Sequence, residues 1–172
     1  MSKERHGAVT IKGNALTVIG EPISVGDAAP DVTLTDNGLK PVKISDSNGK
    51  VRLISVVPSL DTGICDAQTR RMNEEAAGLG DDVVILTVSA EHPFNQKRWC
   101  GDAGVEAVQV LSDHQTMAFG EAYGLWIKEW RLDQRAMFVL DRDGKVTYTE
   151  YVPEIAQFPD YDSALAAVKD AV

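Results

Sequence analysis

The chain has 172 residues, of which 44% are hydrophobic and 25% are charged, and its formal net charge at pH 7 is −9. This length and composition predict a soluble globular protein with a sizeable core and exclude an intrinsically disordered chain. The negative charge argues against nucleic acid or an anionic membrane surface as the main partner, and no apolar run approaches the roughly 18 residues that a membrane-spanning helix needs.

The first residues of the chain are polar. Residues 1–7 have neither the apolar core nor the small-residue cleavage site of a secretory signal. We therefore expect a flexible polar segment at 1–7, a single domain over 8–172 and a cytoplasmic location. Residues 8–18 then alternate between apolar and polar side chains around Gly13-Asn14, which predicts an N-terminal β-hairpin.

Strands and one long helix are expected next. Residues 32–34 and 42–44 are short strand candidates on either side of a turn, and 51–57 (VRLISVV) is an apolar, β-branched run typical of a buried strand. Apolar residues then recur at helical spacing among charged ones from Ala67 to Leu79, which predicts an amphipathic helix. Cys65 therefore lies where the carboxyl end of a strand turns into the first turn of a helix.

The second half of the chain alternates between strands and helices and ends with a hairpin and a last helix. The expected strands are 83–90, 108–111, 135–140 and 145–151, and the expected helices are 93–100, 116–123 and 161–168. Gly101 is a candidate end for the first of these helices. The segment 125–132, with Trp126 and Trp130, has no clear period, and we favour packing over a substrate groove for its tryptophans. This order predicts an α/β layer structure with a mixed central β-sheet flanked by helices.

Cys65 and Cys100 are the two cysteines of the chain, and no cysteine or histidine pair has the spacing of a zinc site, so no metal or cofactor is predicted. A transient disulfide is a better expectation than a structural one for a cytosolic protein. Unpaired backbone N–H groups and the positive end of the helix dipole point at Cys65, which favours the thiolate, the reactive form. Thr62 brings a hydroxyl within reach of that sulfur, and Pro58 rigidifies the loop.

Pro58, Thr62 and Cys65 fit the pattern Pro-x-x-x-Thr-x-x-Cys, which resembles the active-site loop of the peroxiredoxins. The longer strings PSLDTGIC and SAEHPFNQKRWCG, with one cysteine each, resemble the thiol peroxidase branch, the atypical two-cysteine peroxiredoxins, although His92 and Trp99 depart from the expected pattern. The resemblance implies a thioredoxin-like fold and a peroxidase that reduces hydrogen peroxide and organic hydroperoxides. It also implies thioredoxin as the reductant and a homodimer.

The resemblance also assigns roles to individual residues. Cys65 is the nucleophile that becomes a sulfenic acid, and Cys100 is the thiol that resolves it to an intramolecular disulfide. Arg135, at the start of the string RAMFVLD, is the active-site arginine; together with Thr62 it activates the sulfur, and Pro58 shapes the pocket. On the sequence alone, three other arginines compete with Arg135: Arg70, Arg71 and Arg131.

The spacing of the cysteines raises a geometric question. Cys100 follows Cys65 by 35 positions, and a disulfide needs Cα atoms within about 7 Å of each other, so the two sulfurs cannot be assumed to be adjacent. We therefore expect either the first helical turn at Cys65 or the helix end at Cys100 to unravel. Gly63 and Gly101 would lower the conformational cost of either change.

Two other functions compete with peroxide reduction. Cys65 and Arg71 have the Cys-x5-Arg spacing of tyrosine phosphatases, but residues 66–70 contain no glycine and have the pattern of a helix, and Asp66 would repel a dianion. The phosphatase interpretation is therefore disfavoured. A non-enzymatic redox sensor, which passes its oxidation to a partner, stays open, and turnover with a recycling reductant would separate it from an enzyme.

Overall fold

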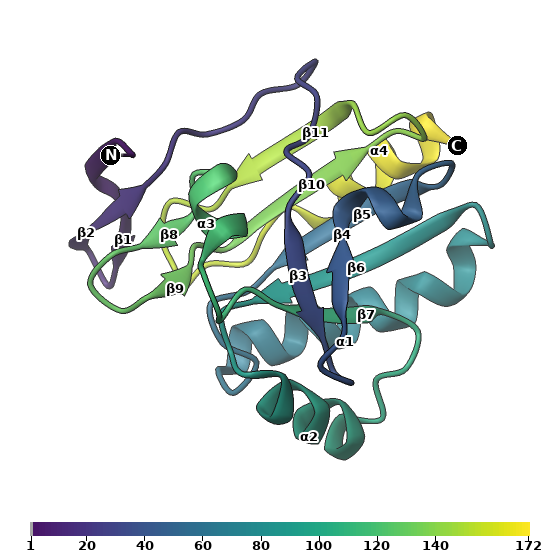
Figure 1. The fold of residues 1–172 in the computed structure, drawn as a ribbon, viewed down its shortest axis with the longest axis horizontal. Helices are drawn as coiled ribbons and strands as arrows, with labels where there is room; N and C mark the ends of the chain where they lie inside the picture. Colours follow the sequence, from purple (N-terminus) through teal and green to yellow (C-terminus); the bar gives the residue numbers. More distant parts are fainter. Residues whose placement is uncertain (1) are drawn as a thin grey trace.

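The structure is a computed structural model that describes residues 2–172 (Figure 1). Its strands are β1 (Glu4–Ile11), β2 (Asn14–Ile19), β3 (Thr33–Asp36), β4 (Pro41–Lys43), β5 (Val51–Val56), β6 (Val83–Ser89), β7 (Gln109–Ser112), β8 (Trp126–Ile127), β9 (Leu132–Asp133), β10 (Ala136–Leu140) and β11 (Val146–Tyr151). Its helices are η1 (Ile44–Ser47, a 3₁₀ turn), α1 (Gly63–Leu79), α2 (Pro93–Ala103), α3 (Ala118–Ala122) and α4 (Tyr161–Ala171). The predicted alternation of strands and helices is confirmed.

A small antiparallel sheet contains the N-terminal part of the chain. β1 and β2 form the predicted hairpin, and β8 and β9 extend it in the order β1-β2-β8-β9. β1 begins within the polar segment 1–7, where Glu4 pairs with Ile19 and His6 with Thr17, and the flexibility expected of that segment stays a prediction. Met1 of that segment lies outside the described residues. The unassigned segment 125–132 contains β8 and the start of β9, which are too short to show a period.

The larger sheet has seven strands in the order β11-β10-β5-β6-β7-β3-β4. β5 pairs with β6 and β6 with β7 in parallel, while the other neighbours are antiparallel, so the mixed sheet expected from the sequence is confirmed. All six residues of β5 are buried, which explains its continuous apolar pattern. Because β5 lies in the interior of the sheet, its carboxyl end delivers the following loop to the middle of the molecule.

Each face of the larger sheet packs on its own core. One core contains residues of β5 and β10 together with α1, α2 and α4, and the other contains residues of the same two strands together with α3. In Figure 1, α1 and α4 lie behind the sheet and α2 lies below β7. The buried side chains of α1 are Cys65, Gln68, Thr69 and Met72, which follow the i, i+3, i+4, i+7 spacing of a single helix face. Cys65 therefore points from α1 toward the sheet.

The helix that carries Cys100 is longer than predicted. α2 continues through Gly101 to Ala103, and it ends at Gly104, whose φ of +66° is left-handed and whose N–H donates to the Cys100 carbonyl oxygen. A left-handed glycine is a common helix terminator, so Gly104 rather than Gly101 ends this helix. In residues 2–172, no helix is long and apolar enough to cross a membrane.

Candidate active site

Cys65 is the third residue of α1, directly after the loop that leaves β5. Thr62 is the N-cap residue of the helix, and its own side chain makes no capping hydrogen bond to the backbone. The Thr62 hydroxyl instead lies 2.8 Å from the Cys65 sulfur, and the Arg135 Nη2 donates to the same sulfur at 3.4 Å. Cys65 is fully buried. The structure thus brings Thr62, Cys65 and Arg135 together, the grouping that the family resemblance implies.

The Thr62 hydroxyl has two partners but only one proton. Besides the Cys65 sulfur it contacts the Ser59 carbonyl oxygen at 3.2 Å. If the sulfur is a thiolate, Thr62 can donate to it; if the sulfur is a thiol, Thr62 can donate to Ser59 and accept from the thiol. The hydroxyl can therefore follow a change in the charge of Cys65.

Arg135 precedes β10 and is almost completely buried, with 1% of its surface exposed. Its Nη1 donates to the Gln68 side-chain oxygen at 2.8 Å, and its Nη2 donates to the Ile155 carbonyl oxygen at 3.0 Å. Within residues 2–172, no carboxylate forms an ion pair with this guanidinium. A buried cation that lacks an anionic partner strongly favours negative charge on its neighbour, here the Cys65 sulfur.

Gln68 is a site residue that the sequence analysis did not identify. It is fully buried, and while its oxygen accepts from Arg135 its Nε2 donates to the Ser55 hydroxyl at 2.8 Å. Gln68 therefore fixes the guanidinium against α1 and β5. The sequence contains a signal for it, because Gln68 lies three residues after Cys65 on the apolar face of the helix. A polar side chain on such a face needs a buried partner.

Tyr161, the first residue of α4, also lies within the influence of the site. Its hydroxyl is buried and has no hydrogen-bond partner among the residues that the structure describes. Burial raises the pKa of Tyr161, while the positive charges of Arg135 and Arg71 act in the opposite direction and Cys65 adds to the rise. The hydroxyl is therefore a neutral group within electrostatic range of the sulfur and the guanidinium.

Cys100 lies on α2 and faces different partners. Its sulfur accepts a weak hydrogen bond from the Asn37 Nδ2 at 3.8 Å, and burial raises the pKa of the thiol. A cavity of about 370 Å³ lies between Cys100, the turn at residues 36–38 and the segment 105–110. Cys65 and Cys100 are both free thiols in the structure. Because Cys65 faces Arg135 and Cys100 faces Asn37, the structure does not present the two sulfurs to each other.

The competing arginines have other partners. Arg70 pairs with Asp66 and lies over the ring of Trp99, Arg71 pairs with Glu75, and Arg131 donates to the His114 carbonyl oxygen. Residues 63–79 form one helix, so the Cys-x5-Arg spacing cannot form a phosphate-binding loop.

Pro58 and the two tryptophans of segment 125–132 were also singled out in the sequence. Pro58 is buried at the start of the loop between β5 and α1. Trp126 is partly buried in β8, whereas Trp130 is 46% exposed between β8 and β9. In the described part of the chain, no group of three or more histidine, cysteine or acidic residues could hold a metal ion.

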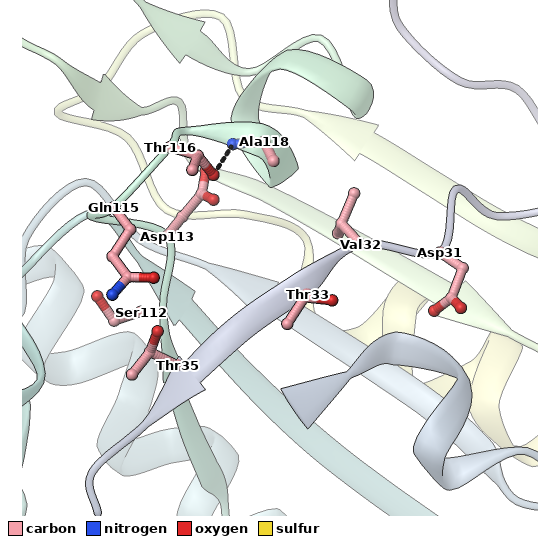
Figure 2. Close-up of a pocket in the computed structure, with 9 residues that line it drawn as sticks. All are labelled: Asp31, Val32, Thr33, Thr35, Ser112, Asp113, Gln115, Thr116 and Ala118. Carbon is pink, nitrogen blue, oxygen red and sulfur yellow. Dashed lines mark hydrogen bonds between the residues drawn. The ribbon is translucent and has the colours of Figure 1, made fainter. Parts of the chain in front are cut away.

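A second cavity, of about 420 Å³, has a lining that does not include Cys65, and Figure 2 shows the residues that form it. It is lined by Asp31, Val32, Thr33, Thr35, Ser112, Asp113, Gln115, Thr116 and Ala118. These residues come from β3 with the segment before it and from the end of β7, the start of α3 and the segment between them. None of them bonds to Thr62, Cys65 or Arg135. The candidate active site is therefore the region around the Cys65 sulfur, with Thr62 and Arg135, and not this cavity.

Comparisons with known proteins agree with this geometry. The family model described as Redoxin matches residues 24–165. The thiol peroxidase of Halalkalibacterium halodurans is 55% identical over 165 residues, which cover 96% of this chain and 99% of that protein, and the thiol peroxidase of Bacillus subtilis is 53% identical over 164 residues, which cover 95% and 98%. The crystal structure of a peroxiredoxin-like protein from Aquifex aeolicus superposes with a TM-score of 0.89 at 36% identity, covering 95% of this chain and 96% of that one.

The fold and these similarities define a peroxiredoxin-type peroxidase, an oxidoreductase. The predicted thioredoxin-like fold is thereby confirmed. The chain belongs to the Redoxin family, in which its relatives are thiol peroxidases.

Proposed function

We propose that this protein reduces hydrogen peroxide and organic hydroperoxides with Cys65 as the nucleophile. The observation that carries the proposal is the buried Arg135, which has no carboxylate partner within residues 2–172 and donates to the Cys65 sulfur. Thr62, the N-cap residue of α1, donates a second hydrogen bond to the sulfur. Two donors and the helix dipole together stabilise a sulfur anion.

In the first step the Cys65 thiolate attacks one peroxide oxygen. An S–O bond forms, the O–O bond breaks, and the leaving oxygen departs as water or an alcohol after it takes up a proton. Negative charge develops on that oxygen in the transition state. Arg135 can stabilise it because its guanidinium is already fixed by Gln68 and the Ile155 carbonyl oxygen.

In the second step the Cys65 sulfenic acid condenses with Cys100. An S–S bond forms, the S–O bond breaks, and the hydroxyl leaves with the thiol proton of Cys100 as water. Because the two sulfurs face different partners, one helix segment has to open first. A dithiol reductant then exchanges with the disulfide and restores both thiols.

The proposed function also includes a reductant that restores the two thiols. The names of the relatives support a thiol as the reductant, and we propose thioredoxin on the grounds of the family resemblance. The homodimer and the cytoplasmic location stay predictions.

Coupled consumption of reductant tests the proposal. We expect no turnover from Cys65→Ser. Cys100→Ser should complete one oxidation at a rate close to that of the wild type and then stall or become over-oxidised. Peptide mapping after one equivalent of peroxide should find a Cys65–Cys100 bridge within one chain.

Two results would contradict the proposal. Turnover by the Cys65→Ser variant would remove the nucleophile from the mechanism, and a bridge between two chains would remove the intramolecular step. A wild type that undergoes one oxidation and is never recycled would instead support the redox sensor.

A further inference from the structure

We propose that Glu91 is a positioning residue that anchors the Cys65 loop to the start of α2 while the disulfide forms. This inference rests on the proposed function. Glu91 lies between β6 and α2, two residues before Pro93, where α2 begins. It touches neither cysteine sulfur in the structure, and it acts through the loop that it holds.

The Glu91 carboxylate accepts hydrogen bonds from the loop on both of its oxygens. The Ser59 hydroxyl donates to Oε1 at 2.9 Å, and the Leu60 N–H donates to Oε2 at 2.8 Å. Hydrogen bonds to a charged acceptor are about twice as strong as neutral ones. Leu60 is itself 1% exposed, so its N–H depends on this carboxylate for a partner.

The other side of Glu91 is fixed in the framework of the sheet. The Ser89 hydroxyl, at the end of β6, donates to Oε2 at 3.0 Å, and it accepts from the Gln96 side chain of α2 at 2.9 Å. The Ser112 hydroxyl at the end of β7 donates to the Glu91 carbonyl oxygen. Glu91 thus joins the Cys65 loop to two strands of the larger sheet, β6 and β7, and to α2.

A second, weaker link runs in parallel with Glu91. Arg98 on α2 lies 3.6 Å from the Asp61 carboxylate of the loop, and both side chains are more than half exposed. Exposed pairs of this kind contribute little free energy. We therefore assign the anchoring to Glu91.

The anchor leaves Cys65 enough chain to reach Cys100. Cys65 follows Leu60 by five residues, and five extended residues span up to about 17 Å. Cys100 follows Pro93 by seven residues of helix, or about 10 Å along α2. If the first turn of α1 unwinds while Leu60 stays on Glu91, Cys65 remains on a short tether close to α2.

The hydrogen bonds between Glu91 and the Cys65 loop would decide whether the sulfenic acid becomes a disulfide or is oxidised further. While these bonds hold the loop on its short tether, the sulfenic acid condenses with the Cys100 thiol and water leaves. With the tether released, the loop samples a larger volume and condensation slows. A second peroxide can then oxidise the same sulfur to a sulfinic acid, with loss of water or an alcohol from that peroxide.

The test compares Glu91→Leu with Glu91→Gln. Leucine removes both acceptors, whereas the glutamine oxygen can accept from Leu60 and Ser89 while its amide donates to the Ser59 hydroxyl. The matched control is Glu74→Leu, at an exposed position of α1. The measurement is the ratio of sulfinic acid to disulfide at Cys65, found by mass spectrometry over a series of peroxide concentrations.

We expect Glu91→Leu to raise this ratio about tenfold, and Glu91→Gln and Glu74→Leu to stay within about threefold of the wild type. A merely structural role would lower the unfolding temperature and leave the ratio unchanged. Ser59→Ala, which removes only one of the hydrogen bonds, should shift the ratio in the same direction by less, and it serves if Glu91→Leu does not fold.

The proposal that Glu91 anchors the loop would be overturned if a folded Glu91→Leu variant had the same ratio of sulfinic acid to disulfide as the wild type. It would also be overturned if Glu91→Gln and Glu91→Leu had equal ratios. Neither result would affect the proposed function, which fails separately if the wild type forms no disulfide at all. The two failures are therefore distinguishable.

Discussion

The guanidinium of Arg135 is held by neutral groups on every side except that of the sulfur. Gln68 and the Ile155 carbonyl oxygen fix its orientation without neutralising its charge. Gln68 differs from a carboxylate in this respect, because a glutamate would form an ion pair with Arg135 and weaken its field at Cys65. The neutral amide of Gln68 therefore holds Arg135 in place and leaves its positive charge available to the Cys65 sulfur.

The role of Arg135 can be tested by Arg135→Lys. Lysine keeps the charge but cannot donate to Gln68, Ile155 and the sulfur in one plane. We expect kcat/KM for hydrogen peroxide to fall by a factor of about 10² to 10³, the usual effect of losing one oriented donor. Stopped-flow oxidation is the measurement, and Arg142→Lys, at an exposed pair with Asp82, is the control. A loss of less than threefold would argue against this role.

Thr62 allows a similar comparison between two substitutions. Thr62→Val removes the hydroxyl, so the sulfur loses its contact at 2.8 Å, whereas Thr62→Ser retains a donor. We expect alkylation of Cys65 by iodoacetamide at pH 7 to slow by about tenfold in the valine variant, since hydrogen bonds to a charged group contribute about 1.5–3 kcal/mol. The serine variant should stay close to the wild type. Equal rates in all three proteins would contradict a contribution of Thr62 to activation.

At the scale of elements, α1 and α2 are held together beside both cysteines. Arg70 of α1 lies over the ring of Trp99, with 5.6 Å between its guanidinium carbon and the ring centroid, and its Nη1 donates to the Ala103 carbonyl oxygen at 3.1 Å. This contact covers the end of α2 near Cys100. Opening the first turn of α1 leaves it in place, because Arg70 lies in the second turn. Opening the end of α2 would break it, so the structure favours movement at Cys65.

The two glycines near the end of α2 should respond in opposite directions to alanine. Gly101 lies inside the helix with open space around its missing Cβ, so Gly101→Ala should stabilise the protein by about 0.5–1 kcal/mol. Gly104 has a φ of +66°, so Gly104→Ala should destabilise it by about 1 kcal/mol, or about 2–4 °C in Tm. Thermal unfolding of both variants checks the pair. Two shifts of the same sign would contradict a helix that contains Gly101 and ends at Gly104.

At the scale of the whole molecule, two buried acids, Asp113 and Asp133, lie together beside α3. Asp113 accepts from the N–H groups of Phe119 and Gly120, while both oxygens of the fully buried Asp133 have no hydrogen-bond partner in the described part of the chain. Burial raises the pKa of Asp113 to about 6, against the pull of those N–H groups and of Arg131. Burial, followed by the charge of Asp113, raises the pKa of Asp133 well above its usual range. The pair therefore retains a proton where ordinary aspartates have lost theirs.

This pair should make stability depend on pH. Between about pH 4 and pH 6 the folded state binds protons that the unfolded chain has released, so the contribution of the pair to the free energy of unfolding falls as the pH rises. A rise from 3.8 to about 6 corresponds to at most about 3 kcal/mol. Asp133→Asn stays uncharged, so its stability relative to the wild type should increase from pH 4.5 to pH 7.5. Urea unfolding of both proteins at pH 4.5 and pH 7.5 tests this expectation. If the free energies of unfolding of the variant and the wild type differed by the same amount at both pH values, the pair would not be the source of the pH dependence.

The local sequence was sufficient to predict most of the fold. The apolar run of β5 and the helical spacing after it place Cys65 at a strand-to-helix junction, because both patterns depend only on neighbouring residues. The hairpin β1–β2 was predicted for the same reason. The errors lie at boundaries: Gly104 rather than Gly101 ends α2, because a glycine stops a helix only where the backbone turns left-handed. β8 and β9 were missed because two residues are too few for a period.

By itself the sequence determined the order of the elements and the position of Cys65 at the N-terminus of a helix, since these depend on contacts between near neighbours in the chain. Only the tertiary structure decided which arginine reaches the sulfur, because Arg135 follows Cys65 by 70 positions and meets it through the pairing of β10 with β5. The same holds for Gln68, whose neutral amide meets the guanidinium from the face of α1. Buried polar groups must find partners, but packing, and not spacing along the chain, selects which ones they find.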